Sequence, residues 1–467
     1  MRYAGLLMLA CSAGCGFLAA QEARIRDASA AVSEGSIAQI MKALGEFETR
    51  NVFSDQEHPT RGAGAARRWI AARFREASPR LRVREDRYRV KKRGRFYRTA
   101  DVVNIIAELP GVQSPERKIL ISGHYDTLHM IYKPRKAGAD PESARDLDHA
   151  ASVAAAAPGV NDDGSGTAAV LELARVLSAY EWDNTLVFAA FDAEEYGLIG
   201  STLHANQARK TGDRIEAVLN NDIIGGDVDG RGRNIGDVVR VFADGPADSR
   251  SRQLLRLVRD VAARYGDGFR VDPVFARDRF GRGGDHTPFH ERGYAAVRFT
   301  TPAEDYAHQH TATDTFDNAS PAYTAKVARV NAAVAAALAL APDPPVITKA
   351  PPPSAQRNSN AANKTSRTAN IARGGDEGKG YDARLRWTAS KAPDVAGYRV
   401  VMRATTAPFW EEEFDAGNKT EFVLKDVSID DRVFGVKAID TDGNESLVEA
   451  YVVPPWPRTA IKAKPRP

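Results

Sequence analysis

Cysteine is scarce in this sequence: the chain has only two among 467 residues, Cys11 and Cys15, and both lie in the first twenty residues. Without that segment no disulfide can form, and no cysteine is left to act as a catalytic nucleophile. The remaining chain must therefore be held together by its apolar core, by bound metal, or by both.

An excess of charge of either sign is also missing. Lysine and arginine number 65, aspartate and glutamate number 61, and the net charge is +4. A chain of this length that is so close to neutral has no general attraction to nucleic acid, which is therefore not an expected partner. The apolar fraction of 43% and the charged fraction of 27% are typical of globular proteins. The length suggests two or three domains.

The N-terminal hydrophobic run is too short to form a stable membrane span. Residues 4–20 are uncharged, follow Arg2, end in two alanines and precede Gln21, whereas a transmembrane helix needs ~20 apolar residues. One positive charge, a short apolar core and small residues at its end predict a signal peptide over residues 1–20 and an exported protein, periplasmic or extracellular. Two alternatives remain open: a short membrane anchor, and acylation of Cys15, although Ser12 stands where an acylation site has a large aliphatic residue.

The pattern along the rest of the chain changes twice. Apolar strands (118–122, 185–191, 216–224, 295–300) alternate with helices (165–179, 250–264, 321–341). This alternation predicts an α/β domain over residues 21–341, with a mostly parallel central sheet covered by helices. Prolines followed by small polar residues predict a linker at 342–380. Apolar residues that alternate with polar ones predict a small all-β sandwich at 381–456, followed by a basic tail at 457–467.

Polar motifs follow the predicted strands or lie in the loops between elements. They are His124-Tyr125-Asp126, Asn161-Asp162-Asp163-Gly164-Ser165-Gly166, Asp192-Ala193-Glu194-Glu195-Tyr196-Gly197, Asn220-Asn221-Asp222, and His308-Gln309-His310-Thr311. Each motif alone is compatible with a solvated loop. In an open parallel sheet, however, the carboxyl ends of the strands form the edge where sites lie. Two histidines and four carboxylates gathered there match a zinc site, and two metals can share one bridging aspartate.

Other catalytic signatures are missing. The sequence has no HExxH helix and no GxSxG nucleophile elbow. Gly230-Arg231-Gly232 lacks the third glycine of a dinucleotide-binding turn. These absences favour the metal site over nucleophilic or nucleotide chemistry.

The order of these motifs resembles that of the family-28 zinc metallopeptidases, the bacterial secreted aminopeptidase group. The resemblance covers roughly residues 35–341, is strongest over 118–315, and includes Asp285-His286-Thr287-Pro288-Phe289. The C-terminal segment resembles a fibronectin type III domain. The resemblance implies a zinc exopeptidase fold.

The resemblance also implies roles for individual residues. One zinc would be bound by His124 and Asp222 and a second by Glu195 and His310, with Asp162 bridging the two. His310 rather than His308 is expected to be the ligand, because the family pattern has a threonine directly after it.

Two further residues would support the chemistry. Glu194 would be the general base, and Asp126 would be the partner of His124. Asp285 and His286 match a family motif near the site but receive no role.

The implied function is an aminopeptidase with two zinc ions per chain that hydrolyses peptides or proteins with a free N-terminus. The sequence departs from relatives that have a tyrosine directly before the last ligand, because that position is Gln309. The long segment Leu128–Pro158 between the first two motifs is expected to form a lid or wall of the site.

Several alternatives remain open. One is a single-zinc acyltransferase similar to glutaminyl cyclase, and another is a non-catalytic binding protein on a peptidase scaffold. The C-terminal sandwich either contacts cell-wall or protein surfaces or serves as a spacer.

Overall fold

The computed structural model describes residues 21–135, 140, 145–347, 372–373 and 382–451. The predicted signal peptide, most of the predicted linker and the basic tail lie outside the described residues. The chain divides into two compact units. One comprises the residues up to Ala341 together with Thr441–Leu447, and the other comprises Pro342–Asp440 and the residues from Val448 onward.

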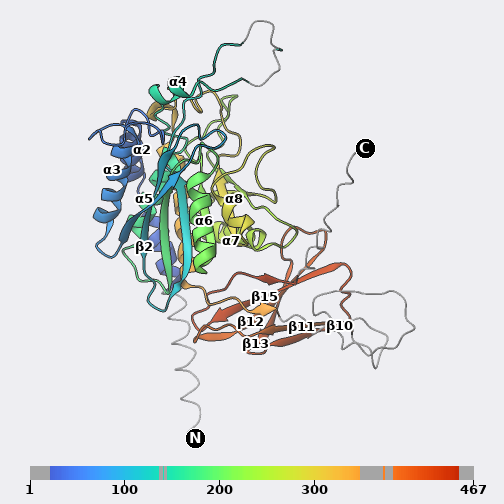
Figure 1. The fold of residues 1–467 in the computed structure, drawn as a ribbon. Coiled ribbons are helices and arrows are strands. Elements are labelled where there is room, and N and C mark those ends of the chain that lie inside the picture. Colours follow the sequence, from blue (N-terminus) through green and yellow to red (C-terminus); the bar gives the residue numbers. More distant parts are fainter. Residues whose placement is uncertain (1–20, 136–139, 141–144, 348–371, 374–381, 452–467) are drawn as a thin grey trace. The chain divides into compact units, whose positions relative to one another are not determined.

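The first unit is built on an eight-stranded sheet with the order β1-β2-β4-β3-β5-β8-β6-β7 (Figure 1). Its strands are β1 (Arg82–Val90), β2 (Ala100–Leu109), β3 (Ser114–His124), β4 (Asn184–Phe191), β5 (Arg214–Asn221), β6 (Val238–Phe242), β7 (Arg270–Val274) and β8 (Ala296–Thr300). The four central strands β4, β3, β5 and β8 are parallel to one another. Antiparallel pairing occurs between β1 and β2, β2 and β4, and β8 and β6. The predicted α/β fold is confirmed, and its parallel part is the centre of a mixed sheet.

Helices cover both faces of this sheet. They are α2 (Glu34–Gly45), α3 (Gly62–Ala77), α4 (His149–Ala154), α5 (Gly164–Leu177), α6 (Ile199–Thr211), α7 (Arg250–Tyr265), α8 (His286–Glu291), the 3₁₀ helix η1 (Phe316–Asn318) and α9 (Pro321–Leu340). Figure 1 shows α2, α3 and α5 on one side of the sheet and α6 and α8 on the other.

The central strands are apolar throughout because both of their faces are buried. In β3, Ile119 and Ile121 pack into the core that contains α5 and α9, while Leu120 packs into the second core, which contains α6 and α8. Successive side chains of a strand point to opposite faces, so a strand covered on both sides reads as a continuous apolar run.

The second unit consists of antiparallel sheets, as predicted for the C-terminal segment. One sheet contains β10 (Ala372–Arg373), β11 (Ala383–Thr388) and β14 (Glu421–Leu424), with β9 (Val346–Ile347) paired to β11. The other contains β13 (Glu412–Gly417), β12 (Val395–Ala404), β15 (Arg432–Asp440) and β16 (Glu449–Ala450). Trp387, Tyr398 and Phe434 are buried in the hydrophobic core of this second unit. The more specific resemblance to fibronectin type III domains stays a prediction.

No helix among the described residues is both long enough and apolar enough to cross a bilayer.

Candidate metal centre

The predicted site residues lie at the carboxyl ends of the parallel strands. His124 is the last residue of β3, Glu194 and Glu195 follow β4, and Asp222 directly follows β5. Asp162 lies in the loop before α5, and His310 lies in the loop between β8 and η1. Residues from five separate stretches of the chain therefore meet at one edge of the sheet, which is where sites in open α/β sheets are expected.

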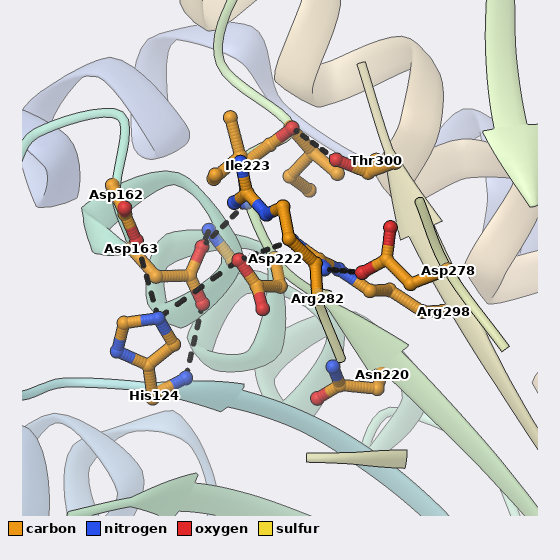
Figure 2. Close-up of polar contacts among 12 residues, drawn as sticks. His124, Asp162, Asp163, Asn220, Asp222, Ile223, Asp278, Arg282, Arg298 and Thr300 are labelled. Carbon is orange, nitrogen blue, oxygen red and sulfur yellow. Dashed lines mark hydrogen bonds and ion pairs between the residues drawn. The ribbon is translucent and has the colours of Figure 1, made fainter. Parts of the chain in front are cut away.

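One group of donor atoms surrounds the ring of His124. Its Nε2 lies 3.2 Å from Asp162 Oδ1 and 3.9 Å from Asp222 Oδ1. All three side chains are buried, and their donor atoms lie within 4.8 Å of one another. Figure 2 shows these side chains turned toward a common point.

A second group surrounds His310 and shares Asp162 with the first. His310 Nε2 lies 3.1 Å from Asp162 Oδ2 and 3.0 Å from Glu195 Oε1. The two oxygens of Asp162 thus face different histidines. One carboxylate between two groups of donors is the arrangement that a bridging ligand requires.

Asp126 links His124 to the loop that carries the paired glutamates. Asp126 Oδ1 accepts a hydrogen bond of 2.9 Å from the backbone N–H of Glu194, and Oδ2 accepts one of 3.3 Å from that of Glu195. Oδ1 also lies 3.5 Å from Nδ1 of His124. Asp126 is fully buried. Through these contacts it fixes the position of the His124 ring relative to the loop that carries Glu194 and Glu195.

Two further carboxylates organise the loops, and sequence reasoning gave them no role. Asp163 caps α5 at Gly166 and also accepts from the backbone N–H groups of His124 and Ile223 (Figure 2). Asp314 accepts from the backbone N–H groups of Asn161 and Asp162 at 2.8 and 3.0 Å. Asp163 belongs to the polar motif before α5, and its position at a helix start was the available signal.

The glycine at position 166 is required by close packing. A Cβ atom there would lie 2.3 Å from the backbone oxygen of Asn221 and 2.4 Å from Oδ2 of Asp163. The start of α5 can therefore approach the end of β5 only without a side chain at this position.

The buried carboxylates of the site shift the pKa values of their neighbours. Burial opposes a charge on His310, but the neighbouring carboxylates of Glu195 and Asp162 outweigh it and raise the pKa of the ring well above its usual value. For Glu194, burial raises the pKa well above its usual value; His124 opposes this shift, and the nearby charges of Asp222 and Glu195 add to it.

The donor set fits zinc. Glu195 Oε1 is buried and lies 3.0 Å from Nε2 of His310 without hydrogen-bond geometry, and a bound cation would satisfy this carboxylate oxygen better than the ring does. Buried imidazole and carboxylate groups, several of them repelling one another, are groups that zinc binds.

Arginine and glutamine side chains complete the walls of the site. The cavity has a volume of about 110 Å³ and is lined by Asp162, Glu194, Glu195, Asp222, Arg282, Gly283, Arg298, Gln309 and His310. Arg298 is 1% exposed and pairs with Asp222 at 3.0 Å and with Asp278 (Figure 2). A charged residue inside the apolar strand β8 was the signal that could have identified it.

The residues around the last proposed ligand have distinct positions. Gln309 donates to Asp162 Oδ2 at 2.8 Å. The ring of His308 lies by Thr313, and His308 lines a neighbouring cavity rather than the donor groups. Tyr306 is 55% exposed, and its hydroxyl accepts from Arg279.

The other residues without an assigned role also lie close by. Asp285 is buried with no hydrogen bond to its carboxylate oxygens among the described residues, and burial raises its pKa to about 7. The segment Leu128–Pro158 begins next to the site, because the Met130 N–H donates to the backbone oxygen of His310 at 2.9 Å. Part of that segment, residues 136–139 and 141–144, lies outside the described residues.

Comparison with solved structures supports the fold. The chain is similar to the LapA aminopeptidase of Legionella pneumophila, with 18% identity, 68% of this chain and 75% of that chain covered, and a TM-score of 0.51. It is also similar to the glutaminyl cyclase of Porphyromonas gingivalis, with 20% identity, 65% and 97% coverage, and a TM-score of 0.50. At these identities the likeness concerns the fold alone.

Sequence comparison is more specific. The model of peptidase family M28 matches residues 104–335. A probable zinc metalloprotease of Leptosphaeria maculans is 32% identical over 446 residues, which cover 89% of this chain and 94% of the relative. A probable zinc metalloprotease of Pyricularia oryzae is 34% identical and covers 91% of this chain and 84% of the relative. Sequence identity at this level along almost the whole chain shows a closer relationship than a shared fold does. We conclude that the chain belongs to peptidase family M28, a family of zinc metalloproteases.

Proposed function

We propose that this protein is a two-zinc exopeptidase that removes N-terminal residues from peptides. The observation that carries the proposal is the position of Asp162 between His124 and His310, with one oxygen near each ring. A site for a single metal has no need of a second histidine and a second set of carboxylates on the far side of a shared aspartate.

Five side chains would hold the metals. His124 and Asp222 would bind one zinc, Glu195 and His310 would bind the other, and Asp162 would bridge them. Bound zinc would lower the pKa of a water molecule and polarise the scissile carbonyl.

Glu194 would move the proton in this reaction. It accepts the proton of the attacking water and returns it to the nitrogen of the leaving amine, a contribution of ~10²–10⁴-fold in rate. Its side chain lines the cavity beside the donor groups. The hydrogen bonds from Glu194 and Glu195 to Asp126 keep the base at a fixed position relative to His124.

The neighbouring cavity supports recognition of a free amino terminus. It has a volume of about 280 Å³ and shares Asp162 and Gln309 with the metal cavity. Its lining contains Glu304, which pairs with Arg279 and Arg282, and five further carboxylates, those of Asp162, Asp227, Asp305, Asp314 and Asp317, but no lysine or arginine. The resulting negative potential favours the ammonium group of a peptide N-terminus over an acylated one.

Peptide digestion combined with metal analysis tests this function. We expect the zinc-loaded chain to shorten free peptides from the amino end, to leave N-acetylated copies intact, and to contain two zinc ions. A chelator should abolish the activity and added zinc should restore it. One zinc ion per chain together with ring closure of N-terminal glutamine would favour the cyclase alternative, and no reaction at full zinc loading would favour a binding protein.

A pair of neighbouring histidines tests the ligand assignment. We expect His310→Ala to lose one of the two zinc ions and His308→Ala to retain both, because only His310 lies among the donor groups. Equal zinc content in the two variants would contradict the assignment of His310.

A further inference from the structure

Three side chains in the lining of the metal cavity carry hydrogen-bond donors and are not proposed ligands: Arg282, Arg298 and Gln309. Peptide hydrolysis needs such a donor, because the carbonyl oxygen of the scissile bond becomes negatively charged when water adds to the carbon.

Two of the three donors already have partners. Arg298 is buried between Asp222 and Asp278 and also donates to the backbone oxygen of Gly283. Gln309 donates to Asp162. Turning either group toward a substrate would leave a buried carboxylate without its donor, which is costly.

Arg282 differs from both. Its guanidinium lies 3.5 Å from Glu304 Oε2, packs over the ring of Tyr306 and is 29% exposed. Glu304 Oε2 accepts no hydrogen bond among the described residues, so this contact is an ion pair without hydrogen-bond geometry. An arginine has five N–H donors, and one ion pair leaves donors for a substrate.

Glu304 holds the side chain of Arg282 in position. The Glu304 side chain is 3% exposed, pairs with Arg279 through its other oxygen, and accepts from the hydroxyl of Thr300 at 3.1 Å. Arg282 is therefore attracted to a buried, anchored carboxylate, and it lines the same cavity as Glu194 and Asp222.

We propose that Arg282 donates hydrogen bonds to the carbonyl oxygen of the scissile peptide bond as that oxygen becomes negative. The proposal rests on the proposed function. Water oxygen bonds to the carbonyl carbon, the C=O electron pair moves onto oxygen, and Glu194 takes the water proton. The oxyanion pair then re-forms the C=O bond as the C–N bond breaks, and the electron pair of the C–N bond goes to nitrogen, which receives that proton. Arg282 stays protonated throughout and acts only on the oxyanion.

The test compares Arg282→Met with Arg282→Lys and with Arg277→Met in the zinc-loaded full chain. Arg277 lies in the same loop and pairs with Asp244 outside the cavity. We expect Arg282→Met to lower kcat by about 10²–10³-fold with little change in KM. We expect Arg282→Lys to lose less, Arg277→Met to match the wild type, and all variants to keep the wild-type zinc content.

A binding measurement separates this proposal from the proposed function. The probes are the phosphonic acid analogue of leucine, whose charged oxygens imitate the oxyanion, and leucinamide, which lacks them. Arg282→Met should bind the phosphonic acid about 10²-fold more weakly than the wild type and leucinamide equally well. Equal phosphonic acid affinity, or a loss confined to KM, would overturn the role of Arg282. A wild-type chain that binds the phosphonic acid through Arg282 but hydrolyses no peptide would overturn the proposed function alone.

Discussion

Replacement of Glu194 by glutamine is the most direct test of the chemistry. The change exchanges one carboxylate oxygen for an amide group of similar size. The hydrogen bond to Asp126 comes from the backbone N–H of residue 194 and survives the substitution. The five proposed ligands are untouched, so the loop and the metal site should keep their geometry.

The structure sets the expected size of the effect. A general base contributes ~10²–10⁴-fold. The other carboxylates and the histidine that line the cavity, Asp162, Glu195, Asp222 and His310, are all proposed ligands, so none is free to replace the base. We therefore expect a loss in the upper part of the range, about 10³–10⁴-fold in kcat, or about 4–5 kcal/mol in the activation barrier.

Steady-state kinetics with aminoacyl nitroanilides, combined with zinc analysis, measures this loss. Glu116→Gln is the matched control, because Glu116 is exposed near the opposite end of β3 and forms a surface ion pair with Arg214. Hydrolysis by Glu194→Gln within about tenfold of the wild type, at full zinc content, would refute the assigned base. Loss of zinc from this variant would show that Glu194 is a ligand instead, since its carboxylate lies within 4.8 Å of donor atoms of His124 and Glu195.

Three further perturbations address stability. Zinc removal should lower the unfolding temperature, because a ligand that binds only the folded state stabilises it by about 2.7 kcal/mol at a free concentration of 100 times its Kd. Calorimetric scans with and without chelator measure this change. Identical scans would contradict a structural contribution of the metal. Burial beside Arg298 lowers the pKa of His286 to about 4 in the folded chain, against ~6.5 when unfolded, so the stability that its neutral ring contributes is complete above pH 6.5 and is lost as the pH falls to 4. In urea titrations over that interval, the free energy of unfolding of His286→Gln should fall by up to about 3 kcal/mol less than that of the wild type. Parallel curves of the two proteins would argue against the shifted pKa. Gly166→Ala should lower the free energy of unfolding by about 2 kcal/mol or more, because the added Cβ would meet the backbone of Asn221. The control Gly35→Ala in α2, where the added Cβ would lie 3.8 Å from Ser33 Oγ, should raise it by about 0.5–1 kcal/mol. A Gly166→Ala chain as stable as the wild type would show that α5 can move away from β5.

The sequence by itself determined the fold class and the chemical types of the site residues. Alternating apolar strands and helices indicated a covered sheet, because burial of both strand faces leaves a local pattern in the chain. The motifs at the strand ends indicated a metal site, since the ends of parallel strands share one edge. His124, Asp162, Glu195, Asp222 and His310 do lie together at that edge.

Only the tertiary structure decided which atoms meet. Strand order brings β3 between β4 and β5, and no local pattern specifies that order. The two oxygens of Asp162 face different rings, and its backbone N–H donates to Asp314, 152 residues away in the sequence. Arg282 lines the same cavity as Glu194, Asp222 and His310, and these residues come from loops that are distant in the sequence. The periodicity of apolar residues in the sequence shows which side chains are buried. Contacts between loops that are distant in the sequence depend on the order and register of the strands, and these are determined by the packing of the whole domain.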